Sequence, residues 1–465
     1  MTFRKIENIF FVGIGGIGMS GIAELLSNLD FNVSGSDISE NENVKRLKKL
    51  NIKVFIGHNS QNITKAHLIV FSSAIPNNNP ELLMAKSKKV PVIRRAEMLG
   101  ELISLKETSI AVGGTHGKTT TSSMIGAVLS YSKKDPTLII GGLVQNIKSN
   151  SKIGSSNIIV VEADEFDRSF LALKPTIAII TNIELEHTDC YVDLDDIKSA
   201  FVQFSKSVPF YGELIVCIDS PSVKEILKEI ERPIITYGFS KEADYQARNV
   251  KFKEQRSSYD IYFKGEKVER IKLNVPGRHN IINSLASIAL SRDMDISFKT
   301  IKEGLLRYQG VRRRFDIKGI YNQVLVVDDY AHHPTEITAT LEAARDGWNK
   351  RIVAVFQPHL FSRTLKFYKE FSDALKIADV IILTDIYPAR EKPIHGVSSE
   401  LIFNELKRDK TNHCYFIPSL KNLEINLDNL LRSNDLLITL GAGTIWRYNI
   451  SYTEHLKLNS NIPIK

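Results

Sequence analysis

The sequence predicts an α/β protein with several domains, each built on a mainly parallel sheet. Short apolar runs of strand length alternate with helix-like segments along most of the 465 residues. Two of these runs end in glycine-rich turns that lead into helices, which is the context of a nucleotide-binding loop. A chain of this length also exceeds one hydrophobic core, so two to four domains are expected.

The composition is that of an ordinary globular protein and excludes several classes. Hydrophobic residues make up 43% of the chain and charged residues 25%. Three widely spaced cysteines give no disulfide framework, and no apolar run reaches the roughly 20 residues of a membrane helix. We therefore expect a cytoplasmic protein without membrane insertion. The net charge of +8 comes from scattered lysines and suits anionic small substrates; no aromatic–basic stripe supports nucleic-acid binding.

The first glycine turn lies near the start of the chain. A strand at 9–12 precedes it and a helical run at 19–29 follows, with glycines spaced as G-x-G-x-x-G. Asp37 ends the next strand, where dinucleotide-binding proteins place the acid that binds a ribose hydroxyl. Taken alone, this turn favours a nicotinamide or flavin enzyme. Its glycines are Gly13, Gly15, Gly16 and Gly18, further strands are expected at 53–56, 68–71 and 90–93, and the first domain closes near Leu105.

The second glycine turn indicates a phosphate loop between a strand at 109–112 and a helix at 120–129. Backbone N–H groups would surround phosphate oxygens, Lys118 would reach the β and γ phosphates, and the Thr119 hydroxyl would bind Mg²⁺. The spacing is shorter than usual because Val112 stands where the first glycine is expected. Gly-Lys-Thr also occurs in ordinary turns, but the flanking strand and helix favour a nucleoside triphosphate. The residues expected at the nucleotide are Gly114, Thr115, His116, Gly117, Lys118, Thr119 and Thr120.

Two further strands of this region end in polar residues. The strand at 157–161 runs into Glu162, in the position of a metal-binding carboxylate, although a solvated acidic turn is the alternative. The strand at 176–182 precedes His187, for which a role in the site and a surface position are equally open.

Residues 212–275 alternate apolar and polar side chains, which suggests an antiparallel insert or an extension of the sheet. A helix is expected at 281–290. Asn280 and Asn283 lie one turn apart and could bind a purine edge; capping of the helix by Asn280 is the alternative.

The β/α rhythm resumes after Gly310, which indicates a domain boundary at the arginines 312–314. Strands are expected at 324–327, 351–356, 380–383 and 436–440, each followed by polar residues. Because ligands bind beyond the carboxyl ends of parallel strands, we expect these ends to line one crevice.

Together these stretches resemble the Mur ligases along almost the whole chain. The most specific parts are the two glycine turns, the stretches 72–75 and 94–99, the acidic stretch 162–165, and the stretches 329–334 and 356–359. The resemblance implies three domains: a Rossmann-like UDP-sugar domain at 1–107, a central ATP-binding ligase domain at 108–313, and a C-terminal Rossmann-like domain at 314–465.

The resemblance also implies roles for individual residues. The first glycine turn would hold the diphosphate of a UDP-sugar, with Asp37, Ser72 and Ser73 nearby. Catalytic roles would fall to Lys118, Glu162, His187, Arg314 and His333. The implied metal ligands are Thr119, Glu162 and His187; the implied adenine contacts are Asn280 and Asn283; Arg314 and Asp329 would lie at the nucleotide, and His332, His333 and Arg363 at the incoming amino acid.

The implied reaction is ATP-dependent joining of L-alanine to the lactoyl carboxylate of UDP-N-acetylmuramate through an acyl phosphate, in peptidoglycan precursor synthesis. Mg²⁺ is the implied cofactor, and a monomer or weak homodimer is expected. One alternative is a sister ligase that attaches a ready-made peptide to the same sugar nucleotide. A nicotinamide oxidoreductase, or an ATPase stimulated by nucleic acid, is an alternative of a different class.

Overall fold

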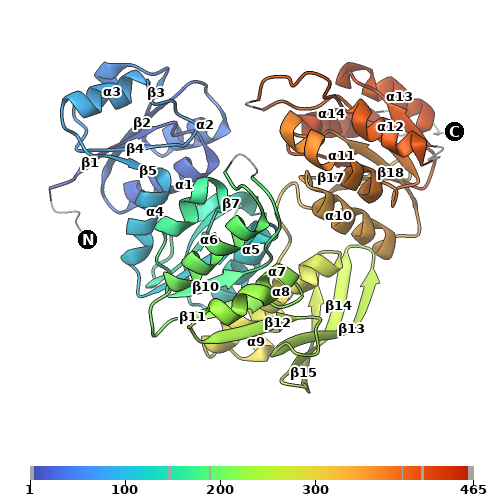
Figure 1. Cartoon of the computed structure of the whole chain (residues 1–465), viewed down its shortest axis with the longest axis horizontal. Helices are drawn as coiled ribbons and strands as arrows, with labels where there is room; N and C mark the ends of the chain where they lie inside the picture. The colour runs from blue at the N-terminus through green and yellow to red at the C-terminus, as the bar shows by residue number, and fades with distance from the viewer. Residues whose placement is uncertain (1–4, 145–148, 188–189, 390, 410–412, 459–465) are drawn as a thin grey trace. The chain divides into compact units, whose positions relative to one another are not determined.

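The computed structural model describes residues 5–144, 149–187, 190–389, 391–409 and 413–458. These residues form three sheets, made in chain order of β1–β5, β6–β15 and β16–β21 (Figure 1). The predicted α/β class is confirmed, and each predicted domain carries one sheet. The chain divides into two compact units: the first comprises Met1–Arg248, Asp260–Ile271 and Ile282–Tyr308, and the second Asn249–Tyr259, Lys272–Ile281 and Gln309–Lys465.

The first sheet has the strand order β3-β2-β1-β4-β5, with parallel neighbours throughout. Alternate residues of β1 enter two apolar clusters: Ile9 and Phe11 pack on the side of α1, and Phe10 and Val12 on the side of α3. A sheet covered on both faces requires such continuous apolar strands. The elements are β1 (Asn8–Val12), α1 (Ile17–Asn28), β2 (Asn32–Asp37), α2 (Glu42–Lys49), β3 (Lys53–Ile56), β4 (Leu68–Phe71), α3 (Pro80–Ser87), β5 (Val92–Arg94) and α4 (Arg95–Ser104).

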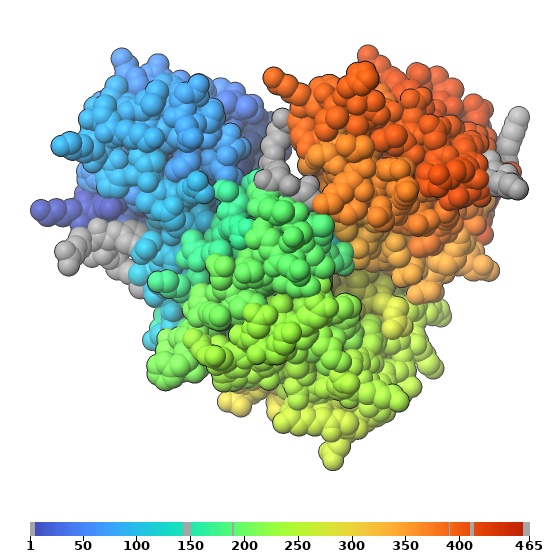
Figure 2. Space-filling model, in the orientation of Figure 1, coloured from blue at the N-terminus to red at the C-terminus, as the bar shows by residue number. Residues whose placement is uncertain are grey.

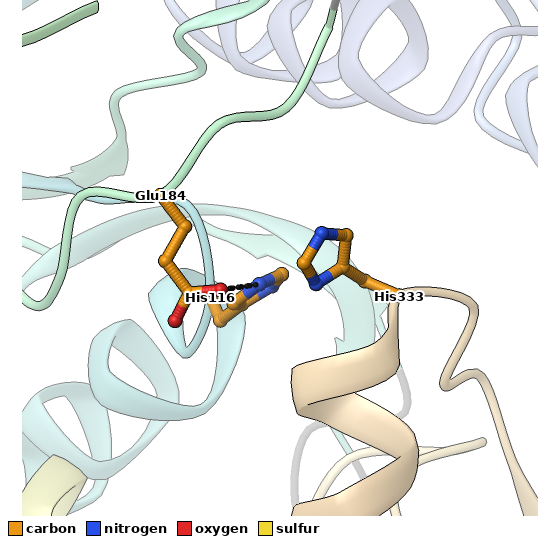
Figure 3. Close-up of side chains that lie close together, drawn as sticks. All are labelled: His116, Glu184 and His333. Carbon is orange, nitrogen blue, oxygen red and sulfur yellow. Dashed lines mark ion pairs between the residues drawn. The ribbon is translucent and has the colours of Figure 1, made fainter. Parts of the chain in front are cut away.

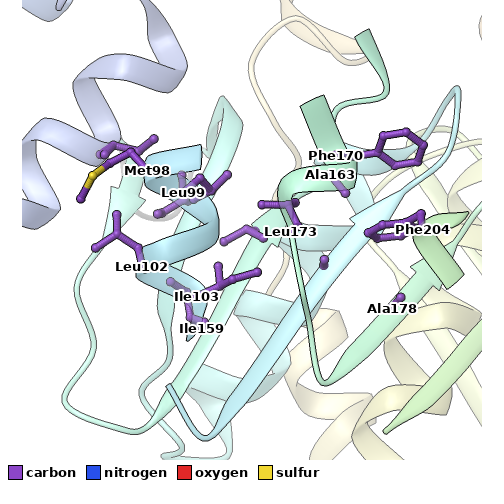
Figure 4. Close-up of a cluster of buried hydrophobic side chains, with 14 of the residues drawn as sticks. Met98, Leu99, Leu102, Ile103, Ile159, Ala163, Phe170, Leu173, Ala178 and Phe204 are labelled. Carbon is purple, nitrogen blue, oxygen red and sulfur yellow. The ribbon is translucent and has the colours of Figure 1, made fainter. Parts of the chain in front are cut away.

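Helix α4 joins the first sheet to the central one. Leu99 of α4 belongs to the same apolar cluster as Ile159 and Phe204 of the central domain (Figure 4). Gly100 allows the close approach, because a Cβ there would lie 2.5 Å from the Ala172 carbonyl oxygen. This shared core explains why the first sheet and most of the central sheet form one unit, and their surfaces adjoin, blue against green, in Figure 2.

The central sheet has the order β15-β14-β13-β12-β11-β10-β6-β9-β7-β8. Of the two alternatives for 212–275, the extension of the sheet is confirmed, because β11–β15 continue the central sheet. β11 and β12 pair in parallel and are joined through a helix, whereas β13–β15 run antiparallel, since neighbouring strands linked by two residues must do so. The elements are β6 (Thr108–Gly113), α5 (Lys118–Tyr131), β7 (Thr137–Val144), β8 (Ser149–Lys152), β9 (Ile158–Glu162), β10 (Ile177–Ile180), α6 (Leu194–Lys206), β11 (Glu213–Cys217), α7 (Pro221–Ile226), β12 (Ile234–Gly238), β13 (Tyr245–Lys253), β14 (Arg256–Phe263), β15 (Glu266–Leu273), α8 (Arg278–Asp293) and α9 (Phe298–Leu306).

The third sheet has the order β16-β17-β21-β18-β19-β20, parallel except for the β16–β17 pair. Val327 and Phe356 pack with α10–α12 on one face, and Val326 and Val355 with α13 and α14 on the other. No helix in the described part of the chain has the length and apolar character needed to cross a membrane. The elements are β16 (Asp316–Tyr321), β17 (Val324–Asp329), α10 (Pro334–Gly347), β18 (Arg351–Phe356), α11 (Phe361–Leu375), β19 (Val380–Leu383), α12 (Glu400–Arg408), β20 (Cys414–Phe416), α13 (Leu423–Leu430), β21 (Asp435–Leu440) and α14 (Ile445–Leu458).

A carboxyl pair at the amino end of the central sheet makes stability depend on pH. Glu213 begins β11 and, with Asp244 and Asp293, lines a cavity of about 430 Å³. Partial burial, the hydrogen bond with Asp293 and the charges of Asp293 and Asp244 raise the pKa of Glu213 to about 8. The folded chain therefore holds this proton more tightly than the unfolded chain. Its contribution to stability is complete below the unfolded pKa of 4.5 and is lost as pH rises towards 8.

We expect the Glu213→Gln variant to lose less stability than the natural chain between pH 5 and pH 8. Solvent screening at this half-open position reduces the size of the effect but not its sign. Thermal unfolding across this pH range measures it, with Glu229→Gln at an exposed position as the control. Parallel curves of melting temperature against pH for the natural chain and Glu213→Gln would contradict the assignment.

Candidate functional site

The loop between β6 and α5 has the backbone of a phosphate-binding cradle. Gly117 stands before the first residue of α5 with a φ of +85°, a left-handed conformation that favours glycine. A Cβ at Gly117 would lie 2.6 Å from the Asn283 side-chain oxygen. Both the conformation and the space therefore require glycine at this position.

Residues that follow β10 hold the loop in place. The His116 carbonyl accepts hydrogen bonds from the Thr181 hydroxyl at 2.6 Å and the Asn182 amide at 3.0 Å. The His116 N–H donates to the Asn182 side-chain oxygen at 2.8 Å, and the His116 ring lies 3.5 Å from the Glu184 carboxylate (Figure 3). The described loop is thus ordered by the protein itself.

Lys118 lies at the centre of the loop in a buried ion pair. Its Nζ donates to the Gly114 carbonyl at 2.6 Å and to the Glu165 carboxylate at 2.7 Å. Burial disfavours the charged form of Lys118, but Glu165 and Asp164 outweigh it and raise the pKa of Lys118. Burial also disfavours the charged form of Glu165, but Lys118 and His187 outweigh it and lower the pKa of Glu165. Both partners are therefore charged, and the loop retains a desolvated ammonium group.

Thr119 and Glu162 form a pair of oxygen ligands beside this lysine. The Thr119 hydroxyl donates to one Glu162 carboxylate oxygen at 3.1 Å, and the Gly141 N–H donates to the other at 2.6 Å. Burial raises the pKa of Glu162, and the hydrogen bond from Gly141 and the charge of Lys118 oppose this shift. A hydroxyl and a carboxylate at the start of a phosphate-binding helix are ligands that suit Mg²⁺.

A second group that could hold a metal ion consists of Glu165, Glu186 and His187. One possible ligand atom from each lies within 4.8 Å of the others, and the two glutamates are 1% and 5% exposed. Of this group, only His187 was predicted from the sequence as a metal ligand. Glu165 and Glu186 carried a signal as well, since each stands in an acidic stretch directly after a strand of the central sheet.

The two asparagines of α8 differ in their surroundings. Helix α8 begins at Arg278, so Asn280 lies inside it, and its side chain donates to the Pro276 carbonyl at 2.7 Å. The capping alternative for Asn280 is therefore wrong. Asn283 lies against the phosphate loop, where its side-chain oxygen accepts from the Thr121 hydroxyl at 3.2 Å.

The first glycine turn is braced by the end of β2. The N–H groups of Gly13 and Ile14 donate to the Ser36 carbonyl at 2.8 and 3.0 Å. One Asp37 carboxylate oxygen accepts the Gly15 N–H at 2.8 Å, so in this state Asp37 shapes the turn.

The edges of the first turn are formed by β4 and α4. A Cβ at Gly13 would lie 3.3 Å from the Ser72 Cβ, so Ser72 borders the turn, whereas Ser73 is exposed. Gly18 lies against Arg95, whose Nη1 would be 3.0 Å from a Cβ there. Sequence analysis did not assign this guanidinium, although the arginine pair 94–95 was part of the recognised pattern.

In the second unit, Arg313 and Arg314 form ion pairs with different carboxylates. Arg313 pairs with Asp328 at 3.3 Å and Arg314 with Glu336 at 3.4 Å. Burial disfavours the charge on Arg314, but Glu336 and Asp329 outweigh it and raise its pKa.

Asp329 is occupied within its own unit. Its two carboxylate oxygens accept the N–H groups of Phe315 at 2.6 Å and Ala331 at 2.7 Å. Burial raises the pKa of Asp329 to about 6 against the opposing charge of Arg314. The nucleotide contact expected of Asp329 stays a prediction.

Two of the three residues expected at the incoming amino acid, His332 and Arg363, follow the strands β17 and β18 and both lie near His359. The His332 ring lies 5.9 Å from the His359 ring, and Arg363 Nη1 lies 3.4 Å from His359 Nδ1. His333 precedes the first residue of α10, is 5% exposed, and packs its ring 5.1 Å from Phe367. No role was assigned to His359 from the sequence, although it is one of the polar residues that follow the strand expected at 351–356, and this position was its signal.

Three family models match successive parts of the chain. The model described as the Mur ligase family, catalytic domain matches residues 8–107, the Mur ligase middle domain matches 112–291, and the Mur ligase, glutamate ligase domain matches 313–443.

Similar proteins agree with these matches over nearly the full length. The UDP-N-acetylmuramate–L-alanine ligase of Syntrophus aciditrophicus is 46% identical over 98% of this chain and 94% of that protein. The protein of the same name from Geotalea uraniireducens is 45% identical over 98% of this chain and 99% of its own length. The solved UDP-N-acetylmuramate–alanine ligase of Thermotoga maritima superposes with a TM-score of 0.82 at 29% identity, covering 97% of this chain and 99% of that one.

The Gly117→Ala variant tests the phosphate cradle. We expect its affinity for a non-hydrolysable ATP analogue to fall at least about tenfold in calorimetry, because the new Cβ meets Asn283 and the left-handed backbone is strained. Gly265→Ala is a matched control, since its φ is +88° and no atom lies within 4 Å of the added Cβ. The control should cost about 1 kcal/mol of stability and leave the affinity unchanged. Equal affinities of Gly117→Ala and the natural chain would refute the cradle.

Proposed function

The chain belongs to the Mur ligase family, and from that premise we propose that it joins L-alanine to the lactoyl carboxylate of UDP-N-acetylmuramate with cleavage of ATP. The observation that carries the proposal is the presence of two different glycine turns in one compact unit, each ordered by its own sheet. One turn carries Lys118 and suits a triphosphate, and the other carries no lysine and suits a nucleotide that is bound but not cleaved. Relatives about 45% identical over almost the whole chain, named for this reaction, support it.

We assign the UDP-sugar to the first turn. Gly13, Gly15, Gly16 and Gly18 give the backbone room to approach a diphosphate, and the amino end of α1 favours its negative charge. Asp37 holds the turn in shape through Gly15. Ser72 and Arg95 border the turn, and we assign them, with the exposed Ser73, as polar and cationic groups for the sugar nucleotide.

We assign ATP to the second turn, with Gly114, Thr115, His116, Gly117, Lys118, Thr119 and Thr120 around its phosphates. Asn283, already against the loop, and Asn280 on the same helix are assigned to the adenine. Thr119 and Glu162 fit Mg²⁺, because a hydroxyl and a carboxylate lie together at the start of the phosphate-binding helix, and we assign His187, which lies with the carboxylates of Glu165 and Glu186, to the same metal site. A bound Mg²⁺ would neutralise phosphate charge at these positions.

The reaction proceeds in two steps. A carboxylate oxygen of the muramate attacks the γ-phosphorus of ATP, ADP leaves, and an acyl phosphate forms. The amine of alanine then attacks the acyl carbon, loses a proton, and phosphate leaves from the tetrahedral intermediate. Two anions must meet in the first step, and at 4 Å their repulsion reaches about 4 kcal/mol at an effective dielectric constant of 20. Lys118, turning from Glu165 to the γ-phosphate, lowers that barrier.

Residues of the second unit are assigned to the remaining roles. The guanidinium of Arg363, with His332 and His333, is suited to the carboxylate of the incoming alanine. Arg314 is suited to the γ-phosphate and Asp329 to the nucleotide. We further propose that the protein acts in the cytoplasm as a monomer or weak homodimer.

Measuring ADP release with UDP-N-acetylmuramate and one amino acid at a time tests the substrates. We expect turnover with L-alanine. Turnover only with a preformed peptide would favour the sister ligase, and a change in NADH absorbance would favour the oxidoreductase. Release that depends on DNA and not on an amino acid would contradict the ligase assignment altogether.

The Lys118→Ala variant separates the two nucleotide sites. We expect ligation to fall on the order of a hundredfold or more, because a charge-assisted contact to the transferred phosphoryl group is lost. The affinity for UDP-N-acetylmuramate in calorimetry should stay unchanged, since that nucleotide uses the other turn. Lys174→Ala, at an exposed position of the same unit, serves as the control. An equal loss of UDP-sugar affinity would contradict separate sites.

A further inference from the structure

Glu81 is a fully buried carboxylate in the first turn of α3 that the reaction described above does not use. It is 0% exposed, yet it lies among polar donors rather than apolar side chains. One oxygen accepts from the Ser36 hydroxyl at 2.7 Å and from His58 Nδ1 at 2.8 Å. The other accepts from the Asn62 amide at 2.8 Å and the Asn59 N–H at 3.4 Å.

These four donors come from two places at the carboxyl edge of the first sheet. Ser36 belongs to the last residues of β2, and the other three donors follow β3, which ends at Ile56. Ligands of open α/β sheets bind beyond this edge. Glu81 therefore ties together the ends of β2 and β3, of which β2 borders the first glycine turn.

The link from Glu81 to the glycine turn is direct. The hydroxyl of Ser36 is held by Glu81, and the carbonyl of the same residue accepts the N–H groups of Gly13 and Ile14. The next residue, Asp37, accepts the Gly15 N–H. The position of β2 relative to the turn thus depends on a side chain that lies about 45 residues further along the chain.

Packing alone does not account for a carboxylate at this position. Burial of a carboxyl group away from water is unfavourable, and an apolar side chain of similar volume often stabilises a fold as well or better. What the carboxylate adds is a fixed geometry of its donors. Errors of about 1 Å in such an edge are enough to weaken a bound nucleotide or its reaction severely.

We propose that Glu81 is a positioning residue for the sugar nucleotide. Through Ser36 it sets the geometry of the first glycine turn, and through His58 it fixes the segment that follows β3 next to the end of β2. The inference rests on the proposed function, because the ligand of the turn is taken to be UDP-N-acetylmuramate. Glu81 touches no reacting atom, so its loss affects binding of one substrate and not the chemical step.

The test uses Glu81→Leu, Ser36→Ala and the double variant in the full-length protein. We expect Glu81→Leu to raise both KM and the calorimetric Kd for UDP-N-acetylmuramate about tenfold or more. KM for ATP and for alanine, and kcat at saturation, should stay within about twofold. Ser36→Ala should raise KM for UDP-N-acetylmuramate about threefold or more. In the double variant it should raise this KM little beyond the value for Glu81→Leu, because both substitutions break the same hydrogen bond between Ser36 and Glu81.

Asp260→Asn is the matched control for a buried acid. Asp260 is 3% exposed and pairs with Arg270 at 2.8 Å on the central sheet, away from the first turn. It should lower the melting temperature and leave KM for UDP-N-acetylmuramate unchanged.

A purely structural role for Glu81 predicts a different pattern and would overturn the proposal. KM values for all three substrates that rise together, or an unchanged KM for UDP-N-acetylmuramate in folded Glu81→Leu, would do so. If Glu81→Leu does not fold, Ser36→Ala decides: an unchanged KM for the sugar nucleotide overturns the proposal. A natural chain that makes no product from UDP-N-acetylmuramate refutes the proposed function, and the inference with it, before any variant is compared.

Discussion

The buried ion pair between Lys118 and Glu165 is the interaction on which the central site depends. An ammonium group in a desolvated loop needs a negative partner. Glu165, which follows the carboxyl end of the neighbouring strand β9, supplies it, with its carboxylate oxygen 2.7 Å from Lys118 Nζ. The pair keeps a cation where the γ-phosphate is expected. A phosphate oxygen can replace the carboxylate at Lys118, while Glu165 keeps His187 at 3.5 Å. Removing one partner of such a pair typically costs about 3–5 kcal/mol, so the loop and the segment after β9 that carries Glu165 are coupled.

Both glycine turns need hydrogen bonds from a neighbouring strand, because glycine alone does not fix the conformation of a loop. The first turn is held by Ser36 and Asp37 at the end of β2, and the second by Thr181 and Asn182 at the end of β10. In each case the strand beside the turn supplies the acceptors and donors that order it. The shared core around α4 then keeps both turns in one compact unit.

The sequence predicted the strands and turns that depend on neighbouring residues in the chain. It did not predict which strands pair with each other or in which direction. Apolar runs gave β3 and β4 with their observed bounds, and glycine spacing located both turns. The strand β8 was missed because Ser149–Lys152 has no apolar pattern, and the direction of β11 and β12 was left open because alternation does not report the direction of a neighbour. Glu81 was not singled out, since only the folded chain brings its donors to it. The assignments of Arg314, Asp329, His332, His333 and Arg363 stay predictions, because the structure describes each beside partners within its own unit.

The central claim is that the cation at Lys118 serves to bring a carboxylate and the γ-phosphate of ATP together. Transfer of oxygen tests it most directly. UDP-N-acetylmuramate labelled with ¹⁸O in both lactoyl carboxylate oxygens is incubated with the protein, ATP, Mg²⁺ and L-alanine, and the released phosphate is analysed by mass spectrometry. An acyl phosphate requires one ¹⁸O atom in each phosphate released. Phosphate without ¹⁸O, formed together with the amide product, would contradict the account.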